Sequence, residues 1–197
     1  MSAAQEPGLA LFPLQTVLFP GGRLPLRIFE TRYMDMAKVC LRDDAPFGVC
    51  LIRDGAEVGA PAEPVEIGCL ARITAWDMPQ LGVLQVLARG ERRFRIRARR
   101  VQADGLTRAD VELLAEESDA PLDADSDLCA RVLRKAIESG GADRVEPPLR
   151  YASAAWVSAR LAELLPLSLA ARQRLLEMDD ARDRIEILRR LISSARQ

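Results

Sequence analysis

The chain has 197 residues, of which 49% are apolar, and its 28 basic and 29 acidic residues leave a formal net charge of −1. This length and composition allow one large core or two small ones, and the near-neutral charge gives no general attraction to nucleic acid or anionic membranes. The chain contains no histidine, which excludes Ser-His-Asp and Cys-His catalytic mechanisms and removes the commonest general base.

The N-terminal residues MSAAQEPG lack the basic and apolar regions of a signal peptide. The longest mostly apolar run, from Leu9 to Pro20, is too short and too rich in proline to span a bilayer. We therefore expect a cytoplasmic protein that makes no contact with a membrane.

The stretch from Leu11 to Glu30, LFPLQTVLFPGGRLPLRIFE, predicts two short apolar strands around the turn Pro20-Gly21-Gly22. We expect the two segments to fold back on each other. Pro13 and Pro25 lack a backbone N–H, which favours sheet edges or a barrel with irregular pairing. A strip left unpaired at such an edge could accept an added peptide strand.

A helix follows this stretch, because apolar residues recur there at helical spacing, and a short strand from Phe47 to Arg53 comes next. Residues 54–66 form a loop. From Glu66 to Leu113 the apolar period is two, which predicts further strands, with a turn at Asp77 to Gly82. About six strands with one helix indicate a small, mostly antiparallel barrel, closed or nearly closed. The residues expected on the buried helical stripe are Tyr33, Met36, Ala37, Cys40 and Leu41.

An acidic stretch at residues 115–127 reads as a linker, and helical periods then continue to the C-terminus. Gly140-Gly141 ends the first helix and Pro166 ends the second, while Ser168 and Asp179-Asp180 open the third and fourth. The sequence therefore predicts an α+β protein with a barrel domain at residues 1–118 and a helical bundle at residues 119–197.

Four segments, in this order, resemble the N-terminal domain of Lon proteases: the FPGG stretch, FGVCLIRDG from Phe47, IGCLARI from Ile67 with LARGERRFRI from Leu87, and LPLSLAARQRLLEMDDARDRIEIL from Leu165. The resemblance implies a PUA-like barrel followed by a helical bundle. It also implies a substrate-binding module that recognises polypeptide segments or a partner protein, linked to protein quality control or proteolysis. The family's ATPase and Ser-Lys protease modules have no matching motif, so we expect a freestanding, non-catalytic domain.

Trp76, Met78 and Leu81 lie in or beside the predicted turn, where we expect them to be partly exposed. Exposed methionine and aromatic side chains adapt to varied apolar partners, which makes these three the candidate peptide-binding residues. The alternative is that the turn folds its own side chains onto the end of the barrel.

The stretch from Arg89 to Arg100 is rich in arginine, and from residue 93 to residue 99 arginines alternate with apolar residues, which places a row of cations on one sheet face. Such a row could bind RNA, as PUA-like barrels often do, and this is the alternative function. We consider a solvated, paired surface the better interpretation, because Asp110 and Glu112 on the following strand would neutralise the arginines. The candidate nucleic-acid-binding residues are Arg93, Arg95, Arg97 and Arg99.

No spacing in the chain predicts a cofactor, a metal site or an oligomeric state. The cysteines lack CxxC spacing and have apolar neighbours, which predicts buried, reduced thiols. The four are Cys40, Cys50, Cys69 and Cys129.

Overall fold

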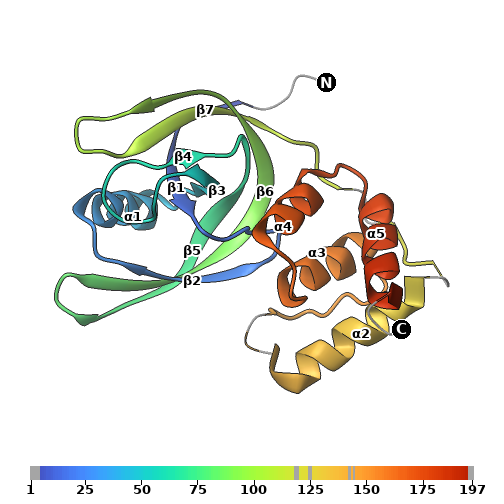
Figure 1. Cartoon of the computed structure of the whole chain (residues 1–197). Coiled ribbons are helices and arrows are strands. Elements are labelled where there is room, and N and C mark those ends of the chain that lie inside the picture. The colour runs from blue at the N-terminus through green and yellow to red at the C-terminus, as the bar shows by residue number, and fades with distance from the viewer. Residues whose placement is uncertain (1–4, 118–119, 124–125, 142, 144, 195–197) are drawn as a thin grey trace. The chain divides into compact units, whose positions relative to one another are not determined.

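The computed structural model describes residues 5–117, 120–123, 126–141, 143 and 145–194. The chain divides into two compact units, Met1–Ala115 and Glu116–Gln197 (Figure 1). The boundary expected from the sequence, at 118–119, lies outside the described residues.

Five strands of the first unit close into a ring in which each pairs with the next. Among the strands that the structure describes, one pairing in this ring is parallel, that of the strand at residues 5–14 with the strand at residues 47–54. The prediction of a mostly antiparallel barrel is therefore confirmed. In order around the ring, the strands are β1 (Gln5–Leu14), β7 (Thr107–Leu113), β6 (Val83–Val101), β5 (Ile67–Gln80) and β3 (Phe47–Asp54). Two more strands attach to this ring: β2 (Arg23–Ile28) pairs with β6, and β4 (Glu63–Pro64) pairs with β3.

The opening stretch does not form the expected hairpin. β1 pairs with β7 and β3, whereas β2 pairs only with β6. The Pro-Gly-Gly turn docks onto β6 instead: Gly21 N–H donates to the Gly90 carbonyl at 2.8 Å, and Gly90 N–H donates to the Gly22 carbonyl at 2.9 Å. A Cβ on Gly90 would lie 2.1 Å from the Phe19 carbonyl oxygen, so this approach requires glycine.

Helix α1 (Thr31–Asp43) packs one stripe against the barrel core, as its apolar spacing predicts. Tyr33, Met36, Ala37 and Cys40 are buried, and only Leu41 of the expected stripe is exposed. The ring of Tyr33 stacks on that of Phe12, with centroids 4.1 Å apart. The helix is thereby fixed to strand β1.

The second unit contains four α-helices within its described residues, at positions close to those predicted (Figure 1). They are α2 (Asp127–Ala136), which continues into the π-helical turn η2 (Ile137–Gly141), α3 (Ala154–Leu164), α4 (Leu169–Glu177) and α5 (Ala181–Ser194). Side chains cap three of them at their N-termini. Ser153 Oγ accepts from Trp156 N–H at 3.1 Å, Ser168 Oγ accepts from Ala171 N–H at 3.2 Å, and Asp180 Oδ1 accepts from Arg182 N–H at 2.7 Å.

A buried arginine ties α5 to α3 and to the segment that precedes α2. The Arg184 side chain is 1% exposed; its Nε donates to Ser158 Oγ at 2.9 Å and its Nη1 to Glu117 Oε1 at 2.7 Å. The Nη2 atom donates to the other Glu117 oxygen, which makes the pair bidentate. Among the described residues, no helix has the length and apolarity needed to cross a membrane.

Candidate functional site

Strands β5 and β6 form a long hairpin, and its outer half is joined by β2 on the far side of β6 (Figure 1). The turn is shorter than the predicted one at Asp77 to Gly82, because β5 continues to Gln80, which pairs with Val83. The turn is therefore the dipeptide Leu81-Gly82, and Gly82 adopts the positive φ of 82° that this tight connection needs. The extra strand length makes a three-stranded arm, β2-β6-β5.

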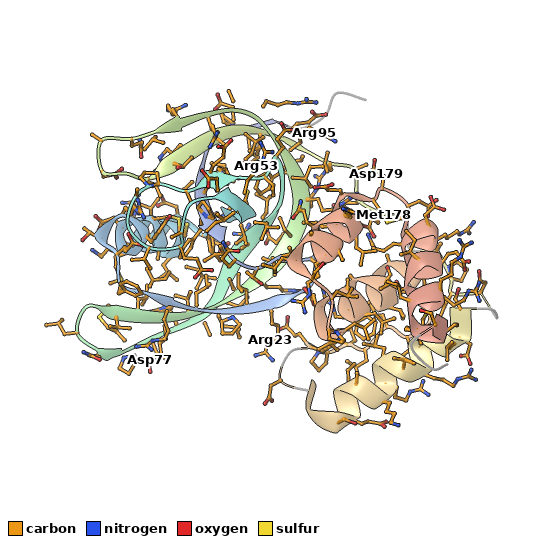
Figure 2. The ribbon with its side chains drawn as sticks, viewed as in Figure 1. Arg23, Arg53, Asp77, Arg95, Met178 and Asp179 are labelled. Atoms are coloured by element: carbon orange, nitrogen blue, oxygen red, sulfur yellow. The ribbon has the colours of Figure 1, made fainter. Side chains whose placement is uncertain are left out.

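The three candidate peptide-binding residues all lie on this arm, and the side chain of Asp77 beside them is labelled in Figure 2. Trp76 is 60% exposed, Met78 40% and Leu81 94%. The expectation of partial exposure is thus confirmed, and these side chains do not fold onto the barrel end. Exposed large apolar groups gathered on one projecting element are typical of an interaction surface.

A groove of about 580 Å³ lies beside Trp76. We call it the Trp76 groove, and its lining is Pro25, Leu26, Arg27, Ala75, Trp76, Asp77, Gln85, Val86 and Leu87. Strand β2 contributes a third of this lining, which the sequence could not reveal while β2 was assigned to a hairpin with β1. The lining is mostly apolar, with Arg27, Asp77 and Gln85 as its polar members, as in binding sites for apolar ligands.

A second groove of about 350 Å³ also uses β2. We call it the Tyr33 groove; it is lined by Phe12, Leu14, Thr16, Leu24, Pro25, Leu26, Arg27, Ile28, Phe29, Glu30, Tyr33, Glu57 and Val58. Burial raises the pKa of the Tyr33 phenol, with the Arg32 guanidinium, 4.7 Å from the ring centroid, opposing the rise. The Tyr33 hydroxyl therefore stays protonated and uncharged at neutral pH.

The arginine row differs from its prediction. Arg93 is buried, at 3% exposure, so it does not belong to an exposed row of cations. The β6–β7 register shifts between Ile96 and Ala98, which also breaks the simple alternation. Both Arg93 and Phe94 are buried, so the sheet is covered on both faces at this point.

Carboxylates pair with the outer arginines; Glu112 is one of the two expected partners, whereas Glu63 on β4 was not predicted. Arg97 Nε donates to Glu112 Oε2 at 2.6 Å, and Arg99 Nη2 donates to Glu63 Oε1 at 3.0 Å. Arg100 lies 4.0 Å from Asp110, while Arg95 is half-buried. This surface is a set of ion pairs rather than a continuous cationic stripe.

The cysteines are all buried and free, as predicted. Burial raises the pKa of the Cys50 and Cys40 thiols, and it raises that of Cys129 to about 11. Within the described ranges, no three cysteine, aspartate or glutamate side chains gather as a metal site.

Comparison with known proteins adds a family match over nearly the whole chain. Residues 8–194 match the family model described as the ATP-dependent protease La (LON) substrate-binding domain. The crystal structure of a Lon N-terminal domain protein from Xanthomonas campestris is similar, with a TM-score of 0.77 and 39% identity, over 94% of this chain and 96% of that one. The N-terminal domain of a Mycobacterium avium complex Lon protease shares the fold, with a TM-score of 0.61 at 17% identity, over 94% of this chain and 96% of that one.

Cereblon proteins are similar over a shorter range. Those of Danio rerio, Xenopus tropicalis and Gallus gallus are 30%, 31% and 29% identical over 51%, 52% and 52% of this chain. The matched segment is 23% of each cereblon. The chain therefore corresponds to less than a quarter of these curated relatives.

Proposed function

Because this chain belongs to the family of ATP-dependent protease La (LON) substrate-binding domains, we propose that it binds exposed polypeptide segments through the β2-β6-β5 arm and does not transform them chemically. The observation that carries the proposal is the apolar surface of the arm. Trp76, Met78 and Leu81 are exposed there, and the open Trp76 groove lies beside them.

The side chains suit a partner of variable sequence. Methionine has a flexible, polarisable side chain, and tryptophan supplies a large apolar face with one hydrogen-bond donor. Unfolded segments present such apolar groups together with backbone amides. Binding would remove apolar surface of both the arm and the bound segment from water, and this would supply most of the binding free energy.

We further propose that this binding delivers misfolded or otherwise marked proteins to proteolysis in the cytoplasm. The family description, which assigns substrate binding to this domain of an ATP-dependent protease, supports this role. We expect purified protein to leave casein intact with or without ATP; turnover would show that the chain itself is an enzyme.

Binding of a fluorescent, reduced and alkylated protein, followed by anisotropy, tests the proposal. Leu81 is 94% exposed, so Leu81→Ser should leave the melting temperature unchanged. Because the proposal places Leu81 in contact with the bound polypeptide, the same substitution should weaken binding about fivefold to tenfold. Val101, 56% exposed at the other end of β6, supplies the matched control Val101→Ser, which should bind like the wild type.

Two results would contradict the proposal. One is the absence of saturable binding by the wild type. The other is equal binding by wild type, Leu81→Ser and Trp76→Ala, which would place the client elsewhere on the molecule.

A further inference from the structure

Among the strands that the structure describes, β2 is an edge strand along its full length. Its six residues pair with β6 on one side, and no other described strand pairs with it. The only other described strand with a single partner, β4, has two residues. An unpaired strand edge presents backbone N–H and C=O groups that another extended chain can bind.

The β2 edge is regular, whereas the competing edge on the same arm is not. The outer half of β5 also has β6 as its one described neighbour, but its register shifts between Ile73 and Ala75 and again between Asp77 and Gln80. Such bulges twist an edge away from further pairing. The β2–β6 register runs without a shift from Arg23 to Ile28.

Pro25 fixes which backbone groups are open. Proline has no N–H and is tolerated in a ladder where its nitrogen points away from the neighbouring strand. Because backbone direction alternates with a period of two, the amides of Arg23 and Arg27 then also point away from β6. The open edge offers these two N–H groups and the carbonyls of Arg23, Pro25 and Arg27.

Both grooves adjoin this edge, since the Trp76 groove and the Tyr33 groove share Pro25, Leu26 and Arg27 in their linings. An extended chain sends successive side chains to opposite sides. A strand lying along β2 could therefore fill one groove with its odd-numbered side chains and the other with its even-numbered ones.

The charges of the two linings select among such strands. Glu30, Glu57 and Asp77 line the grooves, against the single cation Arg27. Glu30 is paired with Arg32 at 2.8 Å, and Glu57 Oε1 accepts from the Gln15 N–H at 2.5 Å. With Glu30 neutralised by Arg32, Glu57 and Asp77 against Arg27 leave a single net negative charge, which favours a ligand with lysine or arginine over one with acidic residues.

We propose that β2 accepts an extended polypeptide segment of apolar and basic residues as an added β-strand, with alternate side chains in the Trp76 and Tyr33 grooves. This inference rests on the proposed function and specifies how the segment is held. Main-chain hydrogen bonds supply affinity for any extended sequence, and the two grooves supply the preference for apolar and basic side chains.

The test measures binding of a synthetic peptide of alternating leucine and lysine, and compares it with an ester analogue of the peptide and with two variants of the protein. Replacing its central amides by esters removes N–H donors while preserving its shape, and we expect about tenfold weaker binding. In the protein, Arg27→Pro removes an N–H from the open edge and should weaken binding about tenfold. Arg27→Ala, the matched control, loses the same guanidinium but keeps that N–H, so it should bind the peptide about tenfold more tightly than Arg27→Pro.

Equal binding of the amide and ester peptides would overturn strand addition, and so would equal binding by folded Arg27→Pro and Arg27→Ala. If Arg27→Pro does not fold, the ester peptide decides. A leucine-glutamate peptide that binds as tightly as the leucine-lysine one would overturn the charge preference. A dimer in sedimentation that Arg27→Pro dissociates would assign the edge to a second copy and overturn the proposal.

Strand addition and polypeptide binding as such are tested separately by these measurements. If the protein binds an unfolded polypeptide, and Leu81→Ser weakens this binding whereas Arg27→Pro and the ester substitution in the peptide have no effect, strand addition alone is refuted. Absence of any polypeptide binding would remove the proposed function as well.

Discussion

Replacing Gly90 by alanine tests the contact that positions β2 and hence both grooves. Gly90 exchanges two backbone hydrogen bonds with the Pro-Gly-Gly turn, one with Gly21 and one with Gly22. An added Cβ would lie 2.1 Å from the Phe19 carbonyl oxygen and 3.2 Å from Leu18 Cγ. The first contact involves backbone, so the turn must move away from β6.

The size of the effect follows from what that movement breaks. Each backbone hydrogen bond contributes about 1 kcal/mol net to stability, and forcing an extra carbon into a packed site costs about 1–3 kcal/mol. We therefore expect Gly90→Ala to lower the free energy of unfolding by about 3–5 kcal/mol. Because β2 follows the turn directly, polypeptide binding should weaken as well.

Urea denaturation, followed by circular dichroism, measures this loss. Gly82→Ala is the control: Gly82 has φ of +82° with no atom within 4 Å of an added Cβ. It should cost only the about 1–2 kcal/mol of a left-handed backbone. If Gly90→Ala costs no more than Gly82→Ala, the docking of the turn on Gly90 does not hold the strand.

Three further predictions concern the rest of the molecule. Glu117→Ala removes both carboxylate oxygens that the buried Arg184 guanidinium contacts, and leaves the 2.9 Å hydrogen bond from Arg184 Nε to Ser158 Oγ. The free energy of unfolding should fall by about 3–5 kcal/mol, because a buried charge loses its partner. A loss below about 1 kcal/mol in urea denaturation would show that the pair is dispensable. Since burial raises the pKa of Cys129 to about 11, its thiolate fraction is small at pH 8 and grows only as the pH approaches that value. A thiol reagent should label it only on unfolding, and rapid labelling of native protein would refute this. Single-stranded RNA should show no salt-dependent affinity, because Arg97 and Arg99 are ion-paired; binding that falls with salt and with a double Arg97→Ala, Arg99→Ala substitution would restore the RNA hypothesis.

Local signals in the sequence predicted the elements that depend on neighbouring residues. The caps at Ser168 and Asp180 lie where expected, and so does the buried stripe of α1 through Tyr33 and Cys40. These features follow from capping and helical periodicity, which are properties of short windows. The cytoplasmic location and the absence of catalysis stay predictions.

Strand pairing over long distances was not predictable in the same way. β1 and β2 are separated by eight residues, and their apolar pattern suits a hairpin as well as a barrel. The pairing of β2 with β6 depends on Gly90, about seventy residues further along the chain, where close backbone approach is possible. An isolated glycine in a strand is a signal for such an approach, though it does not identify the partner.

The candidate site shows the same division. The exposure of Trp76, Met78 and Leu81 followed from their place near a turn, but the Trp76 groove required the pairing of β2 with β6. The error at Arg93 arose because alternation was extended through a strand that is buried on both faces at Arg93 and Phe94. An alternating pattern is taken to mean that every second residue faces solvent, and this inference fails wherever both faces of the sheet are covered.

Backbone amide NMR of the whole chain, with an unlabelled unfolded polypeptide added, tests the central claim most directly. We expect chemical-shift changes concentrated on β2 from Arg23 to Ile28 and on the arm from Ala75 to Leu87. Changes confined to Arg95–Arg100 or to helices α2–α5, or no changes at saturating polypeptide, would contradict the account.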